Sequence, residues 1–190
     1  MKTSSKAWIV VGIIAVLVLI YGFSAYNKFV AIDEQATAQW KQVETQYQRR
    51  YDLIPNLVEV TKGVMKQEQA VFGAIADART RYAGAQTSGS IDDKAKAASQ
   101  LDSAIGRLLV ITENYPQLKS SENVQSLVAE IAGTENRISV ERSRFNSDIQ
   151  AYNVLAKRFP SSIIAAMFGF HERPYFQADA EAAKAPKITM

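Results

Sequence analysis

The stretch RRYDLIPNLV, residues 49–58, places Pro55 inside a run that otherwise has helical periodicity. A loop at the proline would be expected to reset the phase of the apolar residues, whereas a kink would preserve it. The phase is preserved, so the pattern predicts one kinked but continuous helix that ends near residue 82. The apolar positions, at steps of three and four or their multiples, are Ala36, Trp40, Val43, Tyr47, Ile54, Leu57, Val64, Val71, Ile75 and Tyr82.

The proline also defines a candidate site. It removes the amide that would bond the carbonyl of Tyr51, and nearby polar side chains can reach the freed backbone groups. Two interpretations stay open: a fixed bend with local polar repair, or a hinge or recognition corner exposed by the kink. The residues of this candidate kink are Arg49, Arg50, Asp52, Pro55 and Asn56.

Beyond residue 82 the chain gives clear helix boundaries. The segment AGAQTSGS, residues 83–90, has the composition of a loop, and Ser90 with Asp93 resembles a capping box that starts the next helix. Pro116 ends that helix. Ser120 or Ser121 caps the helix that follows, and Pro160 ends this later helix. The run SSIIAAMFGF, residues 161–170, predicts a short fourth helix or an end plug, and no segment has a strand pattern.

The N-terminal segment AWIVVGIIAVLVLIYGFSAY, residues 7–26, contains no charge. About twenty residues at 1.5 Å each cross roughly 30 Å of hydrocarbon, so the segment predicts a transmembrane helix after a leader of residues 1–6. A cleaved signal peptide is the alternative, but a cut after Ala25 would put Phe23 where a small residue belongs.

Orientation is the least determined feature of the span. Lys2 and Lys6 precede it and Lys28 and Lys41 follow it, so the basic residues nearly balance. The two lysines within the six-residue leader favour an inside N-terminus. We therefore expect residues 27–176 to form an extracytoplasmic bundle domain. Residues 177–190 have the small and polar composition of a disordered tail.

Composition excludes several classes of site. The 22 basic and 19 acidic residues are scattered, without the clustered Lys and Arg of a nucleic-acid surface. The absence of cysteine excludes disulfides, thiolate nucleophiles and zinc fingers. A di-iron centre needs two Glu-x-x-His pairs, which the single His171 cannot supply. We therefore expect no cofactor, no metal and no enzymatic activity.

Charged residues nevertheless occur on the apolar stripes of the predicted helices, where charge is costly unless it is paired. They should meet opposite charges. One interpretation is a set of partly buried ion pairs that fix helix register, and the other is a binding niche within the bundle. Besides Arg50, these seam charges are Glu68, Arg79, Glu135 and Arg142.

Several motifs follow the apolar segment in order. They are RRYDLIPNL, ENYPQLKSSENVQSL, TENRISVERSRFN and YNVLAKRFPS. With them, the chain to about residue 176 resembles the LemA family of bacterial membrane proteins. The resemblance implies an all-α fold, in which one transmembrane helix of the bacterial cytoplasmic (inner) membrane precedes an antiparallel bundle of three long helices and a short fourth. It implies no established molecular activity.

Helix lengths suggest how the chain assembles. A helix over residues 27–82 would be about 84 Å long, and the next, at about 38 Å, would return only to the level of Pro55. A stripe near the membrane would then lack a partner within its own chain, which predicts a homo-oligomer; a sharp break at Pro55 is the rival account. The residues of this stripe are Ala36, Trp40, Val43, Tyr47 and Tyr51.

The predicted membrane anchor, the predicted helical bundle and the lack of a recognisable set of catalytic residues together favour a membrane-anchored scaffold or adaptor. Such a protein binds protein partners or itself. The partners would be other membrane or periplasmic proteins of unknown identity. A signalling relay across the membrane is an alternative, and an unrecognised hydrolase is a weaker one.

Overall fold

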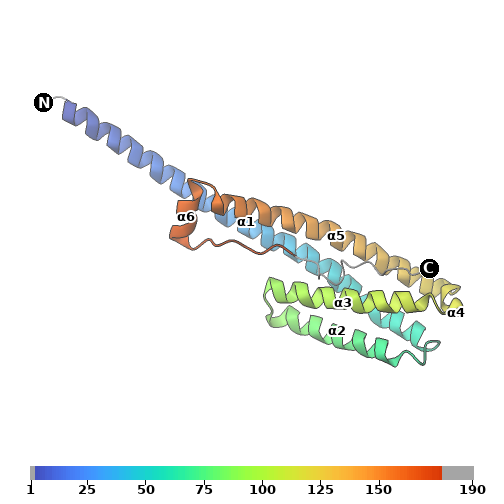
Figure 1. Cartoon of the computed structure of the whole chain (residues 1–190). Helices are drawn as coiled ribbons and strands as arrows, with labels where there is room; N and C mark the ends of the chain where they lie inside the picture. Colours follow the sequence, from blue (N-terminus) through green and yellow to red (C-terminus); the bar gives the residue numbers. More distant parts are fainter. Residues whose placement is uncertain (1–2, 177–190) are drawn as a thin grey trace, which may run out of the picture. The chain divides into compact units, whose positions relative to one another are not determined.

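The computed structural model describes residues 3–176, and every regular element in this range is an α-helix. The predicted all-α fold is therefore confirmed. Figure 1 shows the helices, which are α1 (Thr3–Lys62), α2 (Gln69–Ser88), α3 (Ile91–Thr112), α4 (Pro116–Lys119), α5 (Glu122–Lys157) and α6 (Ser161–Phe168).

The chain divides into two compact units, and α1 and α5 each contribute to both. Unit 1 consists of Met1–Gln39 and Phe145–Tyr175, and unit 2 consists of Trp40–Arg144 and Phe176–Met190.

Unit 1 combines the first part of α1, the end of α5 and α6. Its core is built on Phe29, Tyr152 and Ala165, one residue from each of the three helices. The segment after α6 is also fixed: the Asn153 side chain accepts a hydrogen bond from the Arg173 backbone N–H at 2.9 Å, and Arg173 pairs with Asp33 at 2.8 Å. The short α6 was predicted, and its docking against α1 and α5 closes this core.

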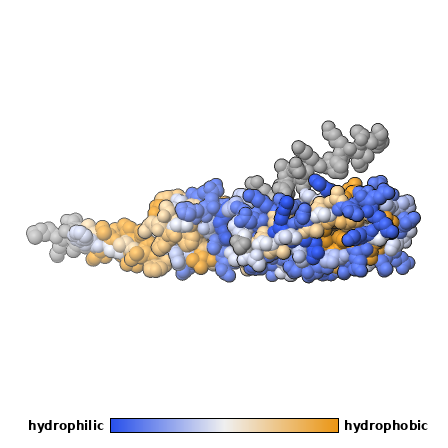
Figure 2. Space-filling model, turned by 90° about the horizontal axis from the view of Figure 1, so that it is seen from below, coloured by the Kyte–Doolittle hydropathy of each residue, from blue (hydrophilic) through white to orange (hydrophobic). Residues whose placement is uncertain are grey.

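The N-terminal part of α1 is apolar and uncovered. Every side chain from Ala7 to Tyr21 is exposed, and an 18-residue window here has a mean hydropathy of 2.5. Figure 2 shows this part of the chain as apolar surface. The helix is long and apolar enough to cross a membrane, in agreement with the predicted span over residues 7–26.

Unit 2 packs the second part of α1 with α2, α3, α4 and the first part of α5. The predicted capping box starts α3, because the Asp93 N–H donates to Ser90 Oγ at 3.2 Å while Asp93 Oδ2 accepts from the Ser90 N–H at 3.1 Å. The chain reverses just before this cap, so α2 and α3 lie antiparallel and side by side (Figure 1). Leu101 and Leu108 of α3 and Ile138 of α5 are fully buried in this unit.

The long first helix ends earlier than predicted. As expected, α1 continues through Pro55, but it stops at Lys62 instead of residue 82, and α2 starts at Gln69. Gly63 disfavours further helix, the N–H of Met65 bonds the carbonyl of Thr61 at 2.9 Å, and the Met65 side chain is fully buried. The turn is therefore anchored from inside the unit.

Two further differences concern boundaries. The helix expected to end at Pro116 ends at Thr112, and Pro116 instead starts the single turn α4, a position where its missing N–H costs nothing. The bundle thus has four long helices, α1, α2, α3 and α5, where three were predicted. The tail predicted over residues 177–190 lies outside the described residues.

Candidate functional site

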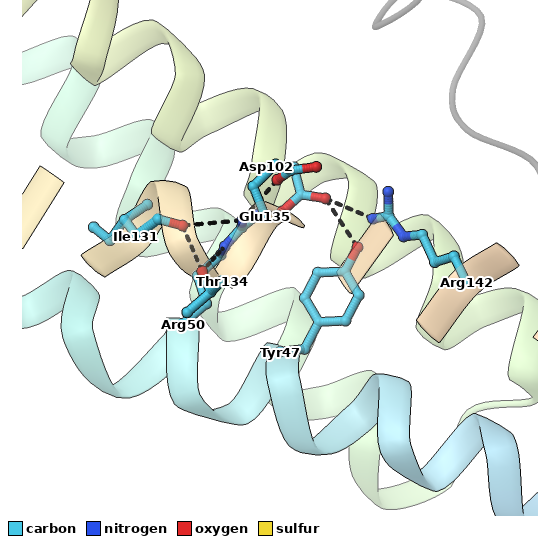
Figure 3. A network of polar contacts seen from close by, with 7 residues as sticks. All are labelled: Tyr47, Arg50, Asp102, Ile131, Thr134, Glu135 and Arg142. Carbon is cyan, nitrogen blue, oxygen red and sulfur yellow. Dashed lines mark hydrogen bonds and ion pairs between the residues drawn. The ribbon is translucent and has the colours of Figure 1, made fainter. Parts of the chain in front are cut away.

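A network of polar side chains lies within unit 2, centred on Arg50 of α1 (Figure 3). Only 2% of the Arg50 side chain is exposed. Its Nε donates to Thr134 Oγ1 at 2.9 Å, and its terminal nitrogens pair with Asp102 and, at 2.6 Å, with Glu135. A longer hydrogen bond of 3.4 Å reaches the carbonyl of Ile131. The guanidinium is thus surrounded by acceptors from two other helices.

Asp102 of α3 is the second centre of the network. In addition to its ion pair with Arg50, its carboxylate accepts hydrogen bonds from Tyr47 Oη at 2.9 Å and from Arg142 Nη2 at 2.7 Å. Tyr47 belongs to α1 and Arg142 to α5. Asp102 therefore connects three helices of unit 2 through one side chain, as Figure 3 shows.

The network balances two guanidinium groups against two carboxylates. Burial raises the pKa of the Asp102 carboxyl to about 7; the positive charge of Arg50 opposes this rise, and the negative charge of Glu135 adds to it. Burial also lowers the pKa of Arg142 to about 10, which leaves that residue charged at neutral pH. The Arg142 guanidinium lies 4.4 Å from the centre of the Phe176 ring, which partly replaces the water it has lost.

With this geometry established, the chain can be compared with known proteins. A family model described as "LemA family" matches residues 39–190, which include the whole network. The chain belongs to the LemA family.

Two magnetosome proteins are also similar to this LemA-family chain. Magnetosome protein MamQ of Magnetospirillum gryphiswaldense is 28% identical over 187 residues, which cover 86% of this chain and 68% of that protein. Magnetosome protein MamQ 2 of Paramagnetospirillum magneticum is 27% identical over the same extents. Family membership and the apolar N-terminal helix make the chain a membrane-associated helical protein.

Two of the four seam charges of this LemA protein join the network and two do not. Glu135 and Arg142 belong to it, whereas Glu68 accepts from Tyr115 Oη at 3.2 Å. Arg79 lies over the Tyr51 ring at 4.3 Å, and within residues 3–176 it forms no ion pair. The expectation that each seam charge meets an opposite charge is therefore wrong for Glu68, which meets a tyrosine hydroxyl, and for Arg79, which meets an aromatic face.

Asp102 was not among the predicted site residues, because it does not interrupt the apolar stripe of its helix. A signal was present: Asp102 follows buried Ala98 by four residues and precedes buried Ile105 by three, so it shares their face of α3. Thr134 and Tyr47 were likewise not recognised as hydrogen-bonding partners, since their role depends on which helices become neighbours.

The candidate kink does not form a single site. Arg50 is in the network, while the exposed Arg49 pairs with Glu130 at 3.0 Å. The Asp52 carboxylate accepts a hydrogen bond from Gln48 Nε2 at 2.8 Å. It was expected to accept from backbone amides near Pro55 instead. Pro55 and Asn56 are exposed.

The stripe expected to face other subunits is instead covered within the chain. Ala36, Trp40, Val43 and Tyr47 are buried, and Tyr51 is half-buried against the Tyr82 ring at 5.8 Å. The prediction of an unpartnered stripe was wrong because α1 ends at Lys62 and not near residue 82. The helices that follow therefore begin about 30 Å closer to the N-terminal end of α1 than predicted. The predicted homo-oligomer would have to use another surface.

Pro55 lines an open groove between α1 and α2. Most of its lining is apolar, and both helices also contribute charged residues. The lining residues are Pro55, Val58, Glu59, Lys62, Phe72, Ile75, Ala76 and Arg79.

Proposed function

We propose that this LemA-family protein is a single-pass scaffold of the bacterial cytoplasmic membrane, with its helical bundle on the extracytoplasmic side. The observation that carries the proposal is the uncovered apolar surface of α1 from Ala7 to Tyr21. No other described part of the chain packs on it, and a bilayer is the environment in which such a surface is stable.

The role of the bundle is to present a fixed surface to protein partners. Ion pairs between Arg50, Asp102, Glu135 and Arg142 set the register of α1, α3 and α5 in unit 2. A surface held in one arrangement loses little conformational freedom when a partner binds, and more of the contact energy then contributes to affinity. We therefore propose action through binding, without catalysis.

The groove beside Pro55 is the partner-binding surface in this proposal. Its lining combines the apolar Val58 and Phe72 with the charged Glu59, Lys62 and Arg79, the mixture of apolar and charged side chains found in protein interfaces. An amphipathic helix of another membrane or periplasmic protein, or of a second copy, is the kind of segment that such grooves accept.

Photo-crosslinking in native membranes tests this function. Benzoylphenylalanine is placed at Phe72 in the groove and, as a control, at Val140, an exposed residue of α5 in the same unit. We expect one discrete adduct from Phe72 and none from Val140. Val58→Glu should abolish the adduct without changing membrane location or thermal melting.

Each result of this experiment has a distinct meaning. An adduct with a second copy would identify a homo-oligomer, and an adduct with another protein would identify the partner. Equal adducts from both positions, or an adduct that persists in Val58→Glu, would contradict a specific groove.

A further inference from the structure

The short helix α6 is apolar on both of its faces. Ser161 and Ala165 are buried, and Ile164 packs against the core of unit 1. On the outward face, however, Ile163 is 52% exposed and Met167 is 71% exposed. A helix that bordered water would be expected to carry polar residues there, yet the segment SSIIAAMF has no charge at all.

The apolar surface begins before the helix and continues to its last residue. Phe159, two residues before α6, is 76% exposed, and Phe168, its last residue, is 56% exposed. Together with Ile163 and Met167 they form what we call the α6 apolar surface. Large exposed side chains gathered in this way are typical of a surface that meets a partner or a membrane.

This surface adjoins the end of the transmembrane segment within unit 1. The Phe168 ring lies 4.9 Å from the Tyr26 ring, and Phe170 stacks on Phe29 at 4.6 Å. A Cβ atom built on Gly22 would lie 3.7 Å from Cδ1 of Ile164. Thus α6 packs against α1 between residues 22 and 29, where the uncharged run ends, and Gly22 is about 6 Å deeper along the helix than Tyr26.

Basic side chains border the same region. Lys28 and Arg158 are exposed, and Lys157 pairs with Glu172 at 2.5 Å. Apolar side chains that enter the acyl region next to Lys and Arg at the headgroup level are the arrangement of helices that lie in a membrane interface. In Figure 2 the apolar surface of the span continues onto the adjoining part of unit 1.

We propose that α6 is a second membrane contact, which lies in the headgroup–acyl boundary of the bilayer that α1 crosses and inserts Phe159, Ile163, Met167 and Phe168 into it. The inference rests on the proposed membrane anchor. The bilayer is favoured over a second copy as occupant, because it surrounds α1 at the depth of Gly22 and Tyr26, where α6 is attached. The basic residues at its border complement anionic headgroups.

Depth-dependent quenching tests the proposal on the full-length protein, whose lack of cysteine allows single labels. The variants are Met167→Cys, Ile14→Cys within the span, and Ala38→Cys. Ala38 is exposed on α1, in unit 1, about 18 Å beyond Tyr26. Each is labelled with an NBD fluorophore and reconstituted into phosphatidylcholine–phosphatidylglycerol vesicles with or without brominated acyl chains.

We expect brominated lipid to reduce the Met167→Cys emission by roughly half or more, as for Ile14→Cys, and to leave Ala38→Cys unchanged. Quenching at position 14 but not at position 167 would overturn the α6 contact and leave the anchor intact. Absence of quenching at position 14 would overturn the anchor and the inference together. If position 167 is unquenched and the unlabelled Met167→Cys variant forms disulfides between copies, the occupant is a second subunit and not the bilayer.

Discussion

Asp102 on α3 and Arg142 on α5 form an ion pair of 2.7 Å in which neither side chain is more than about one-fifth exposed. Asp102 also pairs with Arg50, so the carboxylate is shared between two guanidinium groups. Removal of either arginine would leave the carboxylate with one cation instead of two. This relationship makes the network testable by matched substitutions.

Arg142→Met should lower the free energy of unfolding by about 2–3 kcal/mol, because it leaves a largely buried carboxylate with one cation fewer. The loss stays moderate because Asp102 keeps Arg50 and can also take up a proton. Lys119→Met, which removes an exposed pair with Glu113, should change stability by about 0.5 kcal/mol or less. Urea unfolding in detergent micelles measures both. The double variant Arg142→Met, Asp102→Asn should recover part of the loss, and strictly additive effects would contradict coupling.

Two adjacent arginines provide a second matched pair. Arg50→Lys keeps the charge but loses the planar group that contacts Thr134, Asp102 and Glu135 at once, so we expect a loss of about 2–4 kcal/mol. Arg49→Lys, at an exposed pair, should cost no more than about 0.5 kcal/mol. Equal melting temperatures for the two variants would show that Arg50 is solvated.

The pKa of Asp102 predicts a pH dependence of stability. Because its folded-state pKa of about 7 exceeds the ordinary value of 3.8, the folded chain binds more protons than the unfolded chain between these limits. The contribution of this carboxyl to stability should therefore fall as pH rises from about 4 to 7, by at most about 1.4 kcal/mol per pH unit. Asp102→Asn should lack this component, so unfolding at pH 5 and 7.5 should differ less for the variant than for the wild type. An identical difference would assign Asp102 a normal pKa.

The turn after α1 can be tested at two neighbouring residues. Met65→Ala should cost about 2–4 kcal/mol, because it removes a fully buried side chain that anchors residues 63–68. Val64→Ala, at a side chain that is partly exposed, should cost less than about 1 kcal/mol. Thermal melting and limited proteolysis at the turn would measure the effects, and similar losses for both variants would contradict an anchoring role for Met65.

The sequence predicted helix starts better than helix ends. Ser90 and Asp93 signal a start through local hydrogen bonds, which depend on a few residues only. The end at Lys62 was not visible, because Leu57, Val64 and Val71 are seven residues apart and keep the same phase whether the chain continues or turns back. The helix-length argument for an unpartnered stripe failed with that boundary.

The candidate site shows the same division. The sequence could predict that charges on an apolar stripe, such as Glu135 and Arg142, are paired, since an isolated buried charge is too costly. That Asp102 would be the shared partner of Arg50 and Arg142 could not be predicted, because this depends on which faces of α1, α3 and α5 meet. Helical periodicity places a residue on a face but does not select the opposing helix.

The shared carboxylate of Asp102 also has an evolutionary consequence. A neutral replacement at position 102 removes the carboxylate that pairs with Arg142, and a neutral replacement at position 142 leaves the Asp102 carboxylate with a single cation. Each change alone passes through a less stable protein, whereas a change at both positions keeps the charge in balance. Across LemA-family lineages, positions 102 and 142 should therefore covary, either retained together or exchanged together.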